Sequence, residues 1–149
     1  MNKLPATLDA EKRARMFANF EKQQVMRLFN ARITRVEAGE VQIEFPYQNS
    51  LTQQNGYIHA GVLSTVMDSA CGYAAFSLMA PGCGVLSIEF KVNFLSPAQG
   101  ELFIATGKVI RAGRTVTVCS GEVLAVQNGT QKPAAVMQAT MMTVEQRND

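Results

Sequence analysis

The segment 61–79 most constrains how this chain folds, because it is apolar on nearly every side and carries one formal charge, at Asp68. A helix of this kind has to be enclosed by other parts of the chain. The central acid and several polar residues favour a helix buried in a soluble domain over a membrane span. An ionised carboxylate in apolar surroundings loses water at a considerable free-energy penalty, which marks Asp68 as a candidate functional residue.

The periodicity of the remaining sequence predicts one more helix and six strands. Residues 9–29 have apolar positions at helical spacing, with Asp9 as a candidate N-cap, and 31–47 alternate as a hairpin. Four further strand-like runs follow at 88–94, 102–110, 115–126 and 134–144. Tight turns require antiparallel pairing. We therefore expect an α+β fold in which a curved six-stranded antiparallel sheet wraps the long helix, with an extra N-terminal helix.

Composition excludes several classes of protein. The net charge of +2 is small and spread along the chain, which argues against a nucleic-acid surface. The first twenty residues are charged and lack the apolar run of a signal peptide. With no repeat and no linker, we expect a single domain, with an N-terminal helical extension over 1–30 and the main domain over 31–146.

The three cysteines, Cys71, Cys83 and Cys119, have no metal-ligand spacing and lie in apolar segments. They are expected to be free, buried thiols in a reducing compartment, which predicts a cytoplasmic protein. His59 is the only histidine, so the sequence predicts no metal site. Neither a nucleophile elbow nor a phosphate loop nor a dinucleotide fingerprint is present, and no cofactor is expected.

A candidate reaction centre begins at His59-Ala60-Gly61, where a polar loop becomes the long helix. The first N–H groups of a helix lack internal partners at an electropositive end, so two of them could hold a developing oxyanion. Asp68 follows Gly61 by two helical turns and therefore lies on nearly the same face. It could activate water or attack a carbonyl itself. The alternative is a core Asp satisfied by hydroxyls and backbone amides.

The string from Asn55 to Asp68, followed by Ser87 to Ala98 and by Arg111-Ala-Gly-Arg-Thr115, resembles the hotdog-fold acyl-CoA thioesterases of the PaaI-like, phenylacetate-degradation group. The likeness runs from about 31 to 144. It implies the hotdog fold, in which a curved antiparallel sheet grips a long helix. It also implies homodimers with active sites between the subunits, commonly paired into homotetramers, and hydrolysis of acyl-CoA without a cofactor.

The resemblance implies a role for each residue around the helix start. Asp68 matches the acid that activates water or attacks the thioester carbon. Ala60 stands where the family usually has the first glycine of His-Gly-Gly, whose N–H polarises the thioester carbonyl, and Gly61 matches the second. His59 matches the histidine that helps to place the thioester. Alanine at position 60 is acceptable if the backbone there needs no positive φ.

Other residues match family positions outside the helix. Ser87 falls where a hydroxyl helps to hold the attacking water and would face Asp68 within one subunit. Gln53 lies where relatives often carry Asn. Arg111 and Arg114 match residues that meet the nucleotide of CoA, or they are solvated turn charges.

In the expected reaction, helix-start N–H groups of one subunit bind the carbonyl oxygen and Asp68 of the partner delivers water. The acyl chain would run along apolar side chains such as Val62 and Met67, unless these are plain core. Two other functions stay open for this fold. One is a hydratase or dehydratase, which would be expected to carry a differently placed His and acid. The other is a module that binds acyl-CoA without catalysis.

Overall fold

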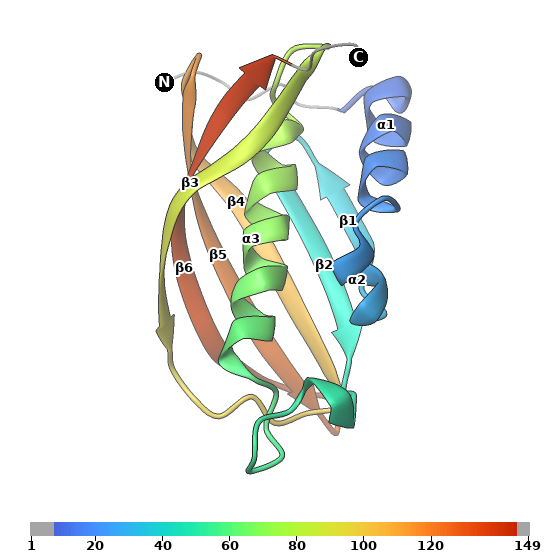
Figure 1. Cartoon of the computed structure of the whole chain (residues 1–149), viewed down its shortest axis with the longest axis vertical. Helices are drawn as coiled ribbons and strands as arrows, with labels where there is room; N and C mark the ends of the chain where they lie inside the picture. Colours follow the sequence, from blue (N-terminus) through green and yellow to red (C-terminus); the bar gives the residue numbers. More distant parts are fainter. Residues whose placement is uncertain (1–7, 146–149) are drawn as a thin grey trace.

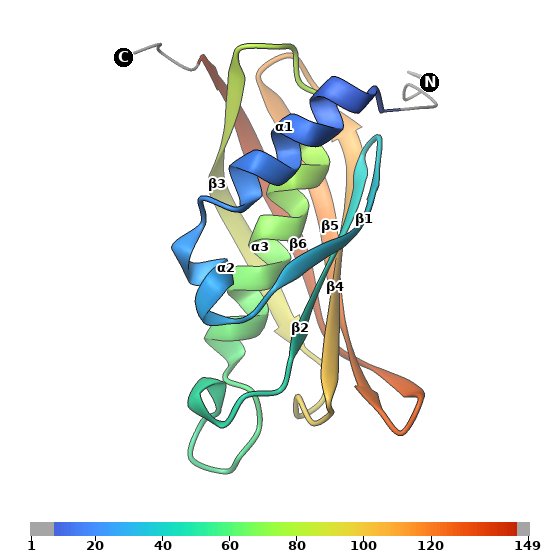
Figure 2. The same ribbon diagram turned by 90° about the vertical axis from the view of Figure 1, so that its right-hand side faces the viewer.

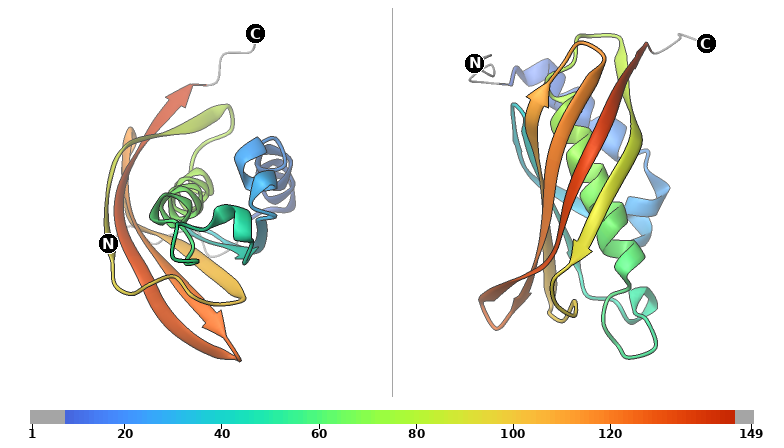
Figure 3. Two further views of the ribbon diagram at one scale, coloured as in Figure 1. Left: turned by 60° about the horizontal axis from the view of Figure 1, so that its bottom comes forward. Right: turned by 90° about the vertical axis from the view of Figure 1, so that its left-hand side faces the viewer.

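The computed structural model describes residues 8–145. Its elements, in chain order, are α1 (Ala10–Phe20), α2 (Gln24–Leu28), β1 (Arg32–Glu37), β2 (Glu40–Pro46), the short 3-10 helix η1 (Asn49–Leu51), α3 (Ala60–Phe76), β3 (Cys83–Phe94), β4 (Leu102–Ala112), β5 (Val116–Gln127) and β6 (Thr130–Glu145). The sheet curves around α3, and α1 and α2 cover α3 on the side away from the sheet (Figures 1 and 3). The predicted α+β architecture with a long wrapped helix is confirmed.

The N-terminal segment forms two helices, so the single helix expected over 9–29 is wrong. Asp9 does cap α1, because its carboxylate accepts a hydrogen bond from the Lys12 N–H at 2.7 Å. The chain then turns at 21–23, so the residues after the turn do not continue the apolar face of α1. As a result Met26 is buried, while Leu28, expected on the apolar face, is 70% exposed.

Side-chain hydrogen bonds fasten these two helices to α3, which α1 crosses in Figure 2. The Tyr73 hydroxyl donates to Asn19 Oδ1 at 2.9 Å. Gln23, in the turn between α1 and α2, donates from Nε2 to the same hydroxyl at 3.1 Å and accepts from the Ser69 hydroxyl at 3.2 Å. These three hydrogen bonds, between two residues on each side, fix how the N-terminal helices lie over α3.

All neighbouring strands pair antiparallel in the order β1-β2-β4-β5-β6-β3. The hairpin β1–β2 turns at Gly39, whose φ of 80° suits glycine. Along β2, Val41, Ile43 and Phe45 alternate inward and are fully buried. The order leaves β1 and β3 as the two edges of the sheet.

Helix α3 lies directly on the sheet because glycine occupies the point of contact. A Cβ at Gly107 of β4 would stand 2.2 Å from the Ala70 carbonyl carbon, and one at Gly121 of β5 would stand 3.0 Å from Cys71 Sγ. The C-terminal half of α3, residues 70–76, is buried throughout. This contact fixes the height of α3 above the sheet and therefore the position of every residue on its outer side.

The start of α3 is fixed by the loop that precedes it. Thr52 and Ile58 form a bridge, the Ile58 N–H donates to the Ala98 carbonyl at 3.1 Å, and the His59 N–H donates to the Leu51 carbonyl at 2.9 Å.

In the stretch 8–145, no helix combines the length and apolarity that crossing a membrane requires. The division at residue 30 stays a prediction, and residues 1–7 and the predicted domain end at 146 lie outside the described residues.

Candidate active site

The helix start gives its first two N–H groups different partners. His59 is the N-cap of α3, and its Nδ1 accepts the Gly61 N–H at 2.8 Å. Ala60 is the first helical residue, and no hydrogen bond found within 8–145 takes its N–H. Among these residues only Asn30 and Asn128 have positive φ without being glycine, so Ala60 needs no glycine backbone. The site therefore presents one open donor, at the positive end of α3.

Helix α3 carries a polar stripe along its N-terminal half. Gly61, Ser64, Thr65 and Asp68 recur at helical spacing and are exposed or half-buried, whereas 66, 67 and 70 are buried. This half of α3 is therefore covered on one side only. The reason is that β3 covers only the later turns, where the Val85 side chain lies about 4.0 Å from the position of a Cβ on Gly72. Asp68 is accordingly half-buried, and water reaches it.

The Asp68 carboxylate is held by a residue from β3. The Ser87 hydroxyl donates to Asp68 Oδ1 at 2.6 Å. The hydroxyls nearer in sequence are occupied, because Ser64 donates to the Ala60 carbonyl at 3.0 Å and Thr65 to the Gly61 carbonyl at 2.7 Å. An acceptor fixed by one hydroxyl and open to water can take a proton from a water molecule.

A bulge in β3 turns Ser87 toward α3. Ser87 pairs with the buried Met141, but the register then shifts, and Glu89 pairs with Thr140 on the outer face. Ile88 is the extra residue. With strict alternation Ser87 would share the outer face with Glu89, so the bulge is what brings the hydroxyl to Asp68.

A cleft of about 520 Å³ lies beside the open N–H of Ala60. Its walls come from the loop before α3, from α3 and from the end of β3: Gln53, Tyr57, Ile58, Ala60, Leu63, Phe94, Leu95, Ser96, Pro97 and Ala98. Phe94 and Leu95 are about half exposed, at 49% and 54%. Apolar side chains dominate these walls, so the cleft suits an uncharged group attached to a carbonyl bound at Ala60.

Gln53 is the one amide side chain among the residues that line the cleft, beside the hydroxyl residues Tyr57 and Ser96, and its side-chain carbonyl oxygen already accepts a hydrogen bond. Its Oε1 accepts the N–H of Asn55, and its own N–H donates to the Tyr57 carbonyl at 2.9 Å. The side-chain amide N–H groups are left for a ligand. The family resemblance selected Gln53 and His59 as site residues, and the structure brings both to the same end of α3.

The two residues expected along the acyl path, Val62 and Met67, lie in different surroundings. Val62 is half-buried, but Met67 is fully buried in the core, away from the walls of the cleft. Met67 lies on the sheet side of α3, close to Gly121, which favours the alternative that it is plain core. Leu63 and Phe94 line the cleft instead. Their helical and strand periodicity marked them as core, and no sequence signal distinguished them.

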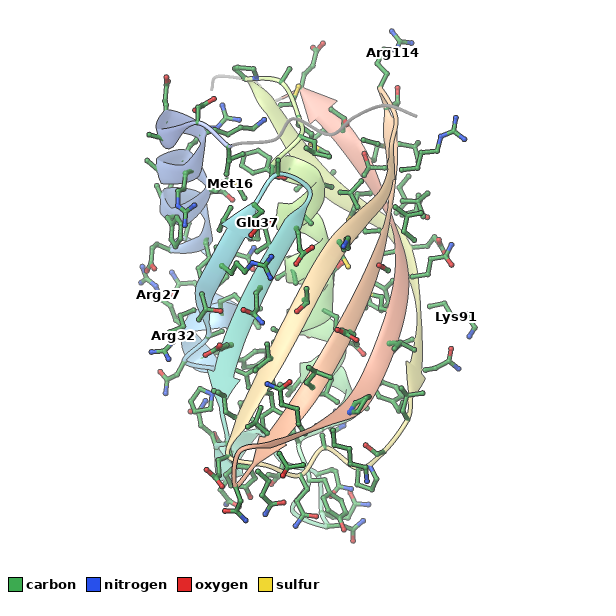
Figure 4. The ribbon with its side chains drawn as sticks, turned by 180° about the vertical axis from the view of Figure 1, so that it is seen from behind. Met16, Arg27, Arg32, Glu37, Lys91 and Arg114 are labelled. Atoms are coloured by element: carbon green, nitrogen blue, oxygen red, sulfur yellow. The ribbon has the colours of Figure 1, made fainter. Side chains whose placement is uncertain are left out.

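Arg111 and Arg114 lie far from the helix start within one chain. Arg114 is at the tip of the β4–β5 hairpin (Figure 4), at the opposite end of the molecule from the start of α3 (Figure 1). Both arginines are exposed, and neither forms an ion pair within 8–145. The structure therefore does not bring them to Ala60 of their own chain.

The three cysteines are free. Burial raises the pKa of the Cys119 thiol to about 12, and burial raises that of Cys71 as well, with smaller contributions from Cys119 and Asp68. Both thiols stay protonated at neutral pH and are poor nucleophiles. Cys83 is half-buried, which differs from the expected burial of all three. Across the described chain, no three His, Cys, Asp or Glu side chains gather as a metal site requires.

Comparison with known proteins places this geometry in a family. The model of the thioesterase superfamily matches residues 55–132, a segment that contains the helix start, Asp68, Ser87 and every residue of the cleft except Gln53. A crystal structure of a thioesterase family protein from Silicibacter pomeroyi is 45% identical, with a TM-score of 0.89 over 91% of this chain and 99% of that one. The PaaI protein of the E. coli phenylacetic acid degradation operon shares the fold at 19% identity, with a TM-score of 0.81 over 93% and 96%.

Sequence relatives extend the comparison. The 1,4-dihydroxy-2-naphthoyl-CoA hydrolase of Listeria monocytogenes is 24% identical over 77% of this chain and 91% of its own length. Proteins of Saccharolobus solfataricus and Halobacterium salinarum that are named as candidate esterases match over 56% to 67% of their own lengths.

Proposed function

Because this chain belongs to the thioesterase superfamily, we propose that it hydrolyses acyl-CoA thioesters to the free acid and CoA. The observation that carries the proposal is the Asp68 carboxylate, which is open to water and held at 2.6 Å by the Ser87 hydroxyl. The relative that is named a CoA hydrolase supports a CoA thioester as the substrate class. Free thiols at Cys71, Cys83 and Cys119 fit a reducing cytoplasm, where we expect the reaction to take place.

The proposed site needs two copies of the chain. Asp68 lies eight residues beyond Ala60 on one helix, which separates their Cα atoms by roughly 12 Å along the axis. The open N–H of Ala60 points out of the helix start, away from Asp68. One thioester carbon therefore cannot touch both groups of a single chain. We assign the N–H to one subunit and the carboxylate to its partner.

The two edges of the sheet support this assembly. Edge strand β1 is protected by charge, because Arg35 pairs with Glu37 at 2.8 Å and with Glu40 at 3.2 Å. Edge strand β3 instead exposes large apolar side chains, with Ile88 at 54% and Phe90 at 45%. Unprotected apolar edges associate with other strands. The homodimer is therefore proposed to form along β3, next to Asp68 and the cleft.

A second apolar surface supports pairing of dimers into a homotetramer. Leu86, Met142 and Val116 lie opposite one another across three strands and are 60%, 39% and 43% exposed. They are on the outer face of the sheet, opposite to α3. Contact there leaves the proposed reaction site open, so the dimer remains the catalytic unit.

The proposed reaction proceeds in two steps. A water oxygen attacks the thioester carbon while its proton passes to Asp68, and the carbonyl electron pair moves to the oxygen that Ala60 N–H binds. The tetrahedral intermediate then collapses: the carbonyl re-forms, the C–S bond breaks, and the proton goes from Asp68 to the departing sulfur. Ser87 keeps the carboxylate oriented. Gln53 and His59 position the thioester and the helix start. Direct attack by Asp68 on the carbon is the other route open to this geometry.

The test is Asp68→Asn, which keeps the size of the side chain and its hydrogen bond from Ser87 but removes the base. Turnover of a panel of acyl-CoA esters, followed by release of free thiol, should fall by a factor of about 10² to 10⁴. Glu89→Gln, a carboxylate-to-amide change on the outer face of β3, is the matched control and should keep wild-type turnover. Size-exclusion chromatography and circular dichroism check that both variants stay assembled and folded. Wild-type turnover by Asp68→Asn, or binding of acyl-CoA without any turnover by the unaltered protein, contradicts the proposal.

A further inference from the structure

A second cavity, of about 350 Å³, adjoins the cleft beside Ala60. It is lined by Pro97, Gln99, Ala125, Gln127, Asn128, Thr130 and Lys132. Pro97 contributes to both cavities, so the segment 96–98 is the wall between them. A ligand that fills the cleft and passes over this wall enters the second cavity of the same chain.

Hydrogen bonds on both sides hold that wall in place. On the side of α3, the Ala98 carbonyl accepts the Ile58 N–H at 3.1 Å. On the other side, the Ser96 hydroxyl donates to the Pro133 carbonyl at 2.8 Å. Pro133 follows Lys132 directly. The two cavities are thus joined rigidly, with the open N–H of Ala60 at one end and Lys132 at the other.

The two cavities differ in chemistry. The first is mainly apolar, whereas the residues that line the second include three with side-chain amides, Gln99, Gln127 and Asn128, and the cationic Lys132. Lys132 forms no ion pair in the part of the chain that the structure describes. The carboxylate of Glu101 does not line the cavity, and it accepts the backbone N–H of Asn128 at 3.1 Å. Amide groups suit the hydrogen-bonding edges of a nucleobase, and an unpaired ammonium suits a phosphate.

We infer that this second cavity binds the phosphorylated nucleotide end of the thioester carrier. The inference rests on the proposed function. In an acyl-CoA, a long uncharged arm joins the thioester to the phosphorylated nucleotide. With the thioester carbonyl at Ala60, this arm would lie in the cleft and the nucleotide in the second cavity, while the acyl group would leave Ala60 on the other side. Lys132 contacts a phosphate and the amides contact the base. Arg111 and Arg114, at the other end of the chain, are not required for this contact.

The experiment compares two thioesters with the same acyl group. One is an acyl-CoA that the protein hydrolyses, and the other is the acyl ester of N-acetylcysteamine, which has the same reacting bond but no nucleotide. Lys132→Gln should raise KM for the acyl-CoA by roughly three- to tenfold and Lys132→Glu by more. Neither variant should change kcat, or kcat/KM for the short ester. The exposed Lys22→Glu, between α1 and α2, is the matched control and should change neither substrate's kinetics.

Added salt should weaken acyl-CoA binding by the unaltered protein but have less effect on Lys132→Gln. The inference is overturned if Lys132 variants keep the wild-type KM for acyl-CoA, or if they lower kcat/KM for both esters equally. It is also overturned if Arg111→Gln/Arg114→Gln, with Lys132 intact, is the variant that raises KM for acyl-CoA alone. If the unaltered protein hydrolyses neither ester, the proposed function itself fails. If the Lys132 variants hydrolyse the short ester with wild-type kinetics, the proposed function stands. An unchanged KM for acyl-CoA then counts only against the nucleotide site.

Discussion

The first two backbone N–H groups of α3 differ in their hydrogen bonding. The Gly61 N–H is taken by the ring of its own N-cap, His59, at 2.8 Å. The Ala60 N–H stays open beside the cleft. His59 has φ −59° and ψ 138°, an extended conformation that is compatible with a following proline. This geometry allows one donor to be removed without disturbing the helix.

Ala60→Pro is therefore a specific test of the oxyanion donor. Proline is tolerated at the first position of a helix, and the only group lost is the N–H that the helix does not use. We expect kcat to fall by about 10² to 10³, with little change in thermal stability. Ala60→Gly is the control and should keep turnover, because it retains the N–H. Normal kcat in the proline variant would show that another group binds the carbonyl oxygen.

At the residue scale, the sequence predicted Asp68 because a lone acid interrupts an apolar helix. It did not predict how far water reaches that acid, since exposure depends on where β3 leaves α3. The roles of Ser87 and Gln53 came only from the family resemblance. The partners that occupy Gly61 N–H and Gln53 Oε1 could not be derived from residue types, because they depend on the loop conformation.

At the scale of elements, periodicity predicted α3 and every strand, but not the irregularities that position the site. In β3, Ile88 seemed to continue the alternation of Phe90, Val92 and Phe94. The register shows instead that Ile88 is the bulge that turns Ser87 toward Asp68. Likewise, nothing in the sequence distinguishes Gly107 from other strand residues. Its role follows from the structure, in which the backbone of α3 lies against it.

The contact of α3 with the sheet predicts opposite effects at two glycines. Gly107→Ala places a methyl group 2.2 Å from the Ala70 carbonyl carbon and should lower the free energy of unfolding by about 1–3 kcal/mol, or prevent folding. Gly72→Ala meets only Val85, at about 4.0 Å, and should raise it by roughly 0.5–1 kcal/mol. Urea unfolding at one protomer concentration measures both. Equal stability of the two variants would contradict the close contact.

At the scale of the whole molecule, one chain is proposed to hold only part of the reaction site. The sequence favoured association, because a six-stranded sheet has two edges, but it did not indicate which edge is used. The structure distinguishes them: ion pairs protect β1, whereas β3 exposes apolar side chains next to Asp68. Ala60 and Asp68 lie too far apart along α3 to act on one carbon. Catalysis and assembly are therefore proposed to be inseparable.

Complementation between two inactive variants tests this account most directly. Ala60→Pro and Asp68→Asn chains, each inactive alone, are co-expressed at equal levels and assayed for acyl-CoA hydrolysis as a mixture. Random pairing makes half of the dimers mixed, and each mixed dimer holds one intact site out of two, so about a quarter of wild-type activity should return. Recovery to that level is the predicted result. A mixture no more active than the two separate variants would show that both groups act within one chain, and the account would be wrong.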